Sequence, residues 1–119
     1  MPMNDLPDPI PAATLILMRP SEAGPPDLLV MERTAHMAFA AGALVFPGGR
    51  TDPDDRALGE KLGRGLDHPA ARVAAIRETI EETGIVPALT SSPDPELAAA
   101  LRRELHEGTP FSALLDRHG

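Results

Sequence analysis

Three glutamates in one short segment could together bind a divalent metal ion. Glu78, Glu81 and Glu82 lie in the run Arg-Glu-Thr-Ile-Glu-Glu-Thr-Gly-Ile at residues 77–85. At about 100° of rotation per residue, a helix places the three carboxylates within roughly a 100° arc of its surface. Like charges one turn apart repel each other, and a hard divalent cation with oxygen ligands relieves that repulsion. Taken alone, the pattern is more typical of an acidic, solvated helix face.

The opposite face of the same segment is apolar and predicts contact with a hydrophobic core. Three aliphatic residues recur there at helical spacing: Val73, Ile76 and Ile80. We expect the helix to start near Pro69, with Asp67 or His68 as its cap, because proline is favoured at the first helical position. Gly84 is a typical C-terminal glycine and marks the expected end.

A glycine pair precedes this helix in the run Phe-Pro-Gly-Gly-Arg at residues 46–50. Together the two segments resemble the signature of the Nudix hydrolases, a loop–helix–loop with a glycine and then Arg-Glu-aliphatic-x-Glu-Glu-x-Gly-aliphatic. Gly49 is the signature glycine, and the second half of the motif runs from Arg77 to Ile85. One position differs, because Thr79 stands where the family has an aliphatic residue. The resemblance covers about half of the chain, and its second half is specific.

Two features of the first half depart from the family pattern. The interval from Gly49 to Arg77 is 28 residues, twice the usual separation, and the additional segment 56–67 predicts a loop rich in glycine and charge. Such insertions are tolerated because the entropy of loop closure grows slowly with length. Six residues past Gly49 stands Asp55 instead of the usual glutamate. The acidic run that contains Asp55 is as typical of a turn as of a metal site.

The resemblance implies hydrolysis of a diphosphate linked to another moiety, with Mg²⁺ or Mn²⁺ as cofactor. Glu78 and Glu82 would hold the metal, which bridges phosphate oxygens and lowers the pKa of bound water. Glu81 is the candidate for a further ligand or for the catalytic base. The carbonyl of Gly49 could complete the coordination, since a glycine lets the backbone approach a metal closely.

Three arginines are candidates for supporting roles in the same reaction. Arg77 precedes Glu81 by four residues, close enough to pair with it and hold its rotamer. The alternative for Arg77 is an ordinary surface ion pair worth less than about 1 kcal/mol. Arg33 and Arg50 are the candidates for binding the substrate.

The segment before the signature suggests a subgroup. Residues 28–49 are similar to the strand that precedes the signature in coenzyme A diphosphatases, most of all in the branch with an insertion inside it. The Arg and His that the group places there are Ala38 and Ala40 in this chain, so CoA or acyl-CoA is only a candidate substrate. A binding module without turnover is the alternative function. The retained carboxylate cluster favours the enzyme.

Composition excludes several other classes of protein. The chain of 119 residues has no cysteine, which rules out disulfides, thiolate zinc sites and a cysteine nucleophile. A net charge of −7 argues against binding a nucleic-acid polymer. The longest apolar run, residues 12–18, is too short for a membrane span or a signal sequence, and we expect a cytoplasmic protein.

The pattern along the chain predicts an α/β (α+β) fold with a Nudix-type mixed sheet. We expect a tail over residues 1–11, then one Nudix domain over 12–119 with the insertion at 56–67 and a helical segment at 94–117. Three strands are predicted, at 12–18, 28–33 and 41–46. The first is expected to be buried and to form a hairpin with the second, and Pro47 is expected to stop the pairing of the third.

Three strands are too few to cover both faces of the signature helix. Residues 96–107 and 110–115 are helical in pattern, with a stripe of Leu97, Leu101 and Leu105, whereas a Nudix sheet ordinarily gains strands after the signature. We therefore expect this chain to be the N-terminal part of a domain. The apolar face of the signature helix would then meet further sequence, or a second copy of the chain in a homodimer.

Overall fold

The computed structural model describes residues 8–32, 42–63, 65–87 and 93–118. Within these residues, six short strands come first: β1 (Ala12–Thr14), β2 (Met18–Arg19), β3 (Asp27–Leu28), β4 (Met31–Glu32), β5 (Leu44–Val45) and β6 (Gly48–Arg50). Four helices follow in the same described ranges: α1 (Pro53–Leu62), α2 (Pro69–Thr83), α3 (Pro95–His106) and α4 (Phe111–His118). The α+β class predicted from the sequence is confirmed.

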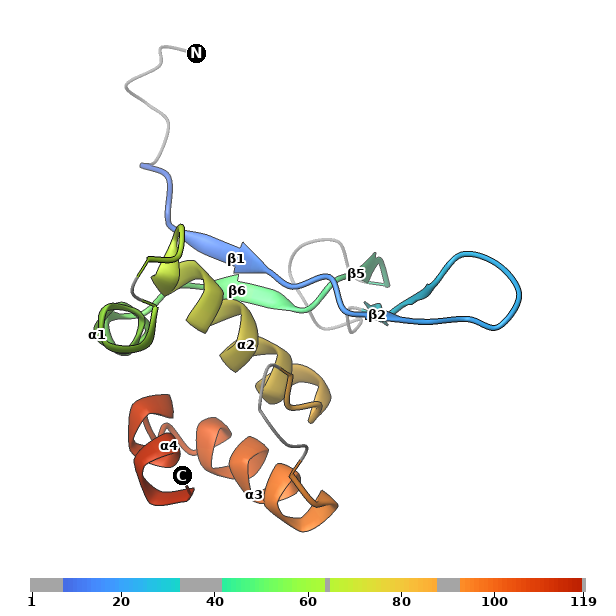
Figure 1. Cartoon of the computed structure of the whole chain (residues 1–119). Coiled ribbons are helices and arrows are strands. Elements are labelled where there is room, and N and C mark those ends of the chain that lie inside the picture. Colours follow the sequence, from blue (N-terminus) through green and yellow to red (C-terminus); the bar gives the residue numbers. More distant parts are fainter. Residues whose placement is uncertain (1–7, 33–41, 64, 88–92, 119) are drawn as a thin grey trace.

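Helix α2 lies at the centre of the structure (Figure 1). The β1–β6 pair covers one side of it, and α3 packs on the other side, with α4 beside α3. Helix α1 contacts both α2 and α4 and so connects the layers. Among the described residues, no helix is both long and apolar enough to cross a lipid bilayer.

The described strands form three separate two-stranded antiparallel sheets, not one mixed sheet. In the first, β1 pairs with β6 so that Ala12 faces Arg50 and Thr14 faces Gly48. The pairing of β5 with β4 ends at Val45, before Pro47 as predicted, and a new pairing with β1 begins at Gly48 in β6. Pro47 has no N–H to donate, but its carbonyl accepts a hydrogen bond of 2.9 Å from the Leu15 N–H.

The predicted buried strand at 12–18 is instead half-exposed and interrupted. Exposure alternates along it, and Ile16 and Met18 are 54% and 62% exposed. The reason is that α2 covers only one face of β1, while successive side chains of a strand point to opposite faces. The predicted hairpin is confirmed by the pairing of Met18 with Leu28 in β2 and β3. Of the other two predicted strands, the one at 28–33 is divided between β3 and β4, and the one at 41–46 corresponds to β5; residues 33 and 41 lie outside the described residues.

The insertion predicted as a loop is largely helix α1. Asp52 caps it: the Asp55 N–H donates to the Asp52 carboxylate (3.0 Å), and the Asp52 N–H donates to the Asp55 carboxylate (2.9 Å). Pro53 occupies the first turn, where a missing N–H costs nothing. The acidic run is therefore a capping box and not a turn.

The signature helix forms where the sequence predicts it. It starts at Pro69 and ends at Gly84, which adopts the left-handed conformation with φ 77°. His68 occupies the N-cap position, but its side chain makes no capping hydrogen bond. Helix α3 is capped by Asp94, whose carboxylate accepts from the Leu97 N–H at 2.8 Å.

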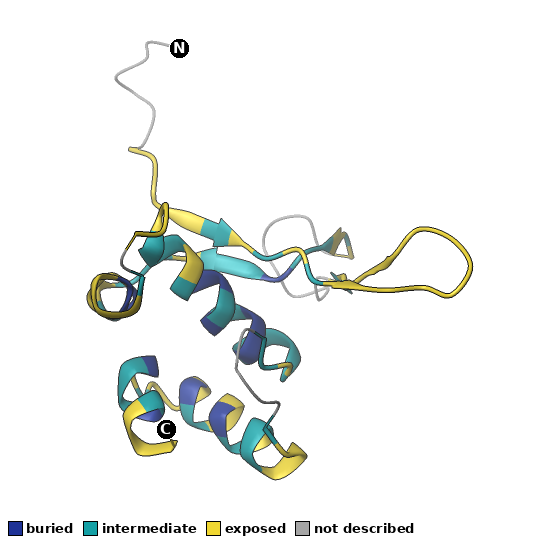
Figure 2. Cartoon of the chain, in the orientation of Figure 1, coloured by how far each residue is buried: buried dark blue, intermediate teal, exposed yellow. Residues whose placement is uncertain are grey.

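The hydrophobic core lies between α2 and the two C-terminal helices (Figure 2). It is made of six buried side chains: Leu58, Ile80, Leu101, Leu105, Phe111 and Leu114. Ile80 is fully buried by these residues, so the expectation that it needs further chain or a second copy is wrong. The helical segment supplies the apolar area itself. Val73 and Ile76 are half-buried beside the same cluster.

We predict that Leu114→Ala lowers the free energy of unfolding by about 2–5 kcal/mol, since it opens a cavity under a fully buried side chain. Urea denaturation followed by circular dichroism measures the change. Leu62→Ala is the matched control, because Leu62 is 61% exposed and its truncation should change stability by less than about 0.5 kcal/mol. Equal effects of the two substitutions would contradict this placement of the core.

Candidate functional site

Arg77 is the centre of a buried ionic network. Its side chain is 8% exposed and that of Asp55 is 0% exposed, and they form a two-pronged ion pair. Nε donates to one Asp55 carboxylate oxygen and Nη2 to the other, each at 2.9 Å. The surface-pair interpretation of Arg77 is therefore wrong. A buried pair of this geometry is strongly coupled, because loss of one partner leaves an uncompensated charge.

The other N–H groups of the Arg77 guanidinium also have hydrogen-bond acceptors. Nη1 donates to Glu78 at 3.0 Å and to Glu81 at 3.2 Å, and Nη2 also donates to the Arg50 carbonyl at 3.0 Å. All five guanidinium hydrogens thus have acceptors. The hydrogen bonds with Asp55, together with the surrounding carboxylates, raise the pKa of Arg77 further above its usual range. The predicted pairing of Arg77 with Glu81 is confirmed, although Asp55 is the closer partner.

Glu78 and Glu82 form a second, acidic cluster against β6. A β-carbon at Gly49 would lie 2.5 Å from the Glu78 carboxyl carbon, so only glycine leaves room for this side chain. Burial, a hydrogen bond with Glu78 and the Glu78 charge raise the pKa of Glu82 from 4.5 to about 7. The Gly48 N–H hydrogen-bonds Glu82 and partly opposes this rise. The raised pKa of Glu82 reflects its burial and its closeness to the Glu78 carboxylate.

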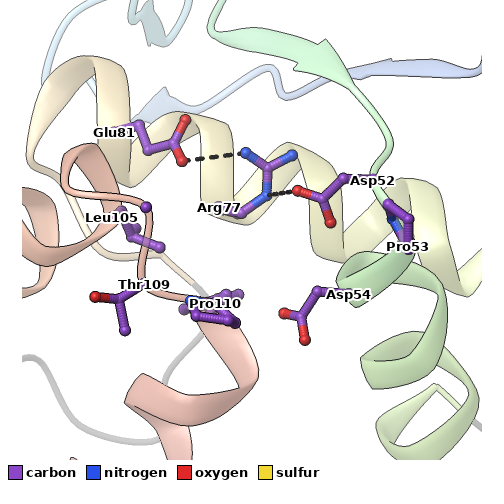
Figure 3. A pocket seen from close by; sticks show the side chains of 10 residues that line it. Asp52, Pro53, Asp54, Arg77, Glu81, Leu105, Thr109 and Pro110 are labelled. Carbon is purple, nitrogen blue, oxygen red and sulfur yellow. Dashed lines mark hydrogen bonds and ion pairs between the residues drawn. The ribbon is translucent and has the colours of Figure 1, made fainter.

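Glu81 accepts a hydrogen bond from Arg77, and the two side chains point toward each other (Figure 3). A cavity of about 240 Å³ lies beside these two side chains and is also lined by Asp52, Asp54, Thr109 and Phe111. Burial and the Glu78 charge raise the pKa of Glu81, and Arg77 opposes the rise. A carboxylate with a raised pKa at the edge of a cavity has the properties of a general base.

A divalent metal would need several oxygen ligands close together. Within the residues that the structure describes, no three acidic or histidine side chains converge as a metal site. Glu78 and Glu82 lie together, and Glu78 and Glu81 both accept hydrogen bonds from Arg77. The Glu78–Glu82 pair nevertheless fits a hard cation, because it brings carboxylate oxygens close together and the Glu78 charge raises the pKa of Glu82.

The remaining predicted residues have different positions. Gly49 lies in β6, where its α-carbon packs on Glu78. Arg50 is exposed and contributes its backbone carbonyl to the Arg77 network. Arg33 lies outside the described residues. Sequence reasoning missed the role of Asp55, although the aspartate-x-x-aspartate spacing of the capping box was a usable signal.

Comparison with known proteins supports the Nudix resemblance. The chain is 28% identical over 91 residues to a Caenorhabditis elegans protein named "Putative nudix hydrolase 7", and this match covers 73% of the chain and 28% of that protein. It is similar to the crystal structure of a NUDIX hydrolase from Alicyclobacillus acidocaldarius, with a TM-score of 0.74 and 31% identity. That alignment covers 94% of this chain and 55% of the solved one. No family model matches the chain. The fold is thus that of part of a Nudix hydrolase.

We predict that Asp55→Asn lowers the free energy of unfolding by about 3–5 kcal/mol, because the Arg77 charge stays buried without its counter-charge. Urea denaturation at pH 7 measures the loss. Asp27→Asn is the control: it breaks the exposed pair with Arg19 and should cost less than about 1 kcal/mol. A loss as small as that of the control would show that the buried pair does not hold the fold.

A second prediction concerns pH in metal-free buffer. Because the folded-state pKa of Glu82 is raised, the folded state binds more protons than the unfolded state between pH 4.5 and about 7. The free energy of unfolding should therefore fall as pH rises through that interval. Glu82→Gln removes the titration, so its stability relative to the parent should increase with pH. A difference that stays constant from pH 4 to pH 8 would rule out the raised pKa of Glu82.

Proposed function

We propose that this chain is the catalytic part of a Nudix-family hydrolase that cleaves the diphosphate linkage of a nucleotide derivative. The observation that carries the proposal is the Glu78–Glu82 pair, held against the glycines of β6 on a helix whose sequence follows the Nudix pattern. The similarity in sequence and fold to two Nudix hydrolases supports it. The chain spans 28% of the curated relative and about half of the solved one.

Glu78 and Glu82 would hold Mg²⁺ or Mn²⁺ through their carboxylate oxygens. When bound, such a cation withdraws charge from the diphosphate oxygens and acidifies water, which lowers the barrier to attack on phosphorus. The protein contributes the placement of the two carboxylates. Gly49 makes room for Glu78, and the Gly48 N–H orients Glu82.

Glu81 is the favoured base of the proposed reaction. Its carboxylate accepts a hydrogen bond from Arg77 and borders the cavity of Figure 3. Arg77 orients this carboxylate and, through Asp55, ties it to α1. The exposed guanidinium of Arg50 is available for the anionic substrate. CoA and acyl-CoA are the candidate substrates, on the resemblance of residues 28–49 to CoA diphosphatases.

We predict that millimolar Mg²⁺ or Mn²⁺ raises the melting temperature of the chain, since a ligand that binds only the folded state stabilises it. Glu82→Gln should abolish most of the rise, because an amide is a poorer ligand for a hard cation. Glu60→Gln, which removes an exposed carboxylate on α1, should leave the rise intact. Equal shifts in Glu82→Gln and the parent would exclude metal binding at Glu82.

Turnover is measured separately on a panel of diphosphates that includes CoA, acyl-CoA and nucleoside diphosphate derivatives, each with Mg²⁺ and Mn²⁺. Mass spectrometry of the products identifies which phosphate bond is cleaved. Hydrolysis that Glu82→Gln abolishes and Glu60→Gln leaves intact would support the proposal. Metal binding with no cleavage of any member of the panel would argue against a hydrolase of this substrate class.

A further inference from the structure

The last turn of α2 receives its hydrogen bonds from another helix. The last carbonyls of an α-helix have no partner within the helix and must find one elsewhere. The Gly84 N–H donates to the Ile80 carbonyl at 2.9 Å, and the carbonyls of Glu81 and Glu82 are among those that remain. No basic residue lies in the last turn of α2 itself. Positive charges, which stabilise the negative C-terminal end of the helix dipole, must therefore come from another element.

Helix α3 supplies the missing donors. Arg102 Nε donates to the Glu81 carbonyl at 3.0 Å, and its Nη2 donates to the Glu82 carbonyl at 3.1 Å. His106, one turn further along α3, places Nε2 2.7 Å from the same Glu81 carbonyl. The Arg102 side chain also lies over Gly84, where an added β-carbon would be 3.5 Å from it. The guanidinium thus spans two consecutive carbonyls.

Helix α3 is itself held in place by its packing in the hydrophobic core. Leu101 and Leu105 are buried in the core beside Ile80 of α2. Helix α4, which follows α3, is tied to α1 because the Ser112 N–H donates to the Asp54 carboxylate at 3.1 Å. The donors of α3 are therefore presented by a firmly packed element and not by a loop.

We propose that Arg102 is a positioning residue that fixes the backbone of Glu81 and Glu82, and through it the two carboxylates of the site. The proposal rests on the proposed function. Gly48 of β6 holds the Glu82 side chain from one side, and Arg102 holds its carbonyl from the other. The segment 95–118 is then part of the machinery that shapes the site, in addition to completing the core.

Arg102 can affect metal affinity because a metal site tolerates little displacement of its ligands. Partners that orient the ligands of a metal typically contribute a factor of about 10–100 in its affinity. Among the described residues Arg102 contacts no carboxylate oxygen, so its influence on metal affinity must pass through the backbone. We expect Arg102→Ala to weaken Mn²⁺ binding about tenfold.

The experiment compares Arg102→Ala, Arg102→Lys and Arg103→Ala with the parent chain. Arg103 is the matched control, since its exposed guanidinium makes no hydrogen bond or ion pair within the described part of the chain. Amide hydrogen exchange of peptides covering residues 80–86 reports the order of the last turn, and electron paramagnetic resonance titration gives the Mn²⁺ affinity. Melting temperatures confirm that each variant is folded under the conditions used.

The expected result is faster exchange at residues 80–86 and weaker Mn²⁺ binding in Arg102→Ala, with Arg103→Ala unchanged. Arg102→Lys should recover part of both losses, because lysine keeps the charge but cannot span two carbonyls. Faster exchange with unchanged Mn²⁺ affinity would overturn the positioning role. If the parent binds no Mn²⁺, the proposed function fails, and unchanged exchange in Arg102→Ala would separately refute the contact between the helices.

Discussion

The burial of one positive charge constrains most of this structure. Arg77 leaves water with its side chain 8% exposed, and a buried guanidinium is tolerated only if its charge and all its donors are matched. Asp55 supplies the charge from α1, the Arg50 carbonyl supplies an acceptor from β6, and the glutamates of α2 supply the rest. These partners come from three elements, so α1, β6 and α2 must meet at one point. The network thereby places the glycine pair of β6 beside the acidic face of α2.

The same network gives the three glutamates of α2 different surroundings. Glu78 and Glu81 both accept from Arg77, but Glu81 borders the cavity, whereas Glu78 and Glu82 lie together against the glycines. Carboxylates with different environments can take different roles in one reaction, one as a ligand and another as a base. These differences come from the neighbours of each carboxylate and not from the spacing of the glutamates, which would allow all three to converge.

The sequence predicted local features of this fold well and long-range ones poorly. Helix α2 was predicted from its apolar period, its proline start and its glycine end, all of which are local signals. Helix α1 was missed because a capping box and an acidic turn use the same residues. The ion pair between Asp55 and Arg77 joins residues 22 positions apart and has no periodic signature. Likewise, the apolar run at 12–18 gave no sign that only one of its faces would be covered.

The acidic pair also explains why the C-terminal helices matter for the site. Holding Glu78 and Glu82 together opposes folding at neutral pH, since their charges repel and both are partly buried. That cost must be offset elsewhere, and the strands cannot do so, because most of their apolar side chains remain exposed. The buried leucines of α3 and α4 pack directly on Ile80, which lies on the same helix turn as the glutamates. Hydrophobic burial on one face of α2 thus offsets the repulsion between the Glu78 and Glu82 carboxylates on the other face.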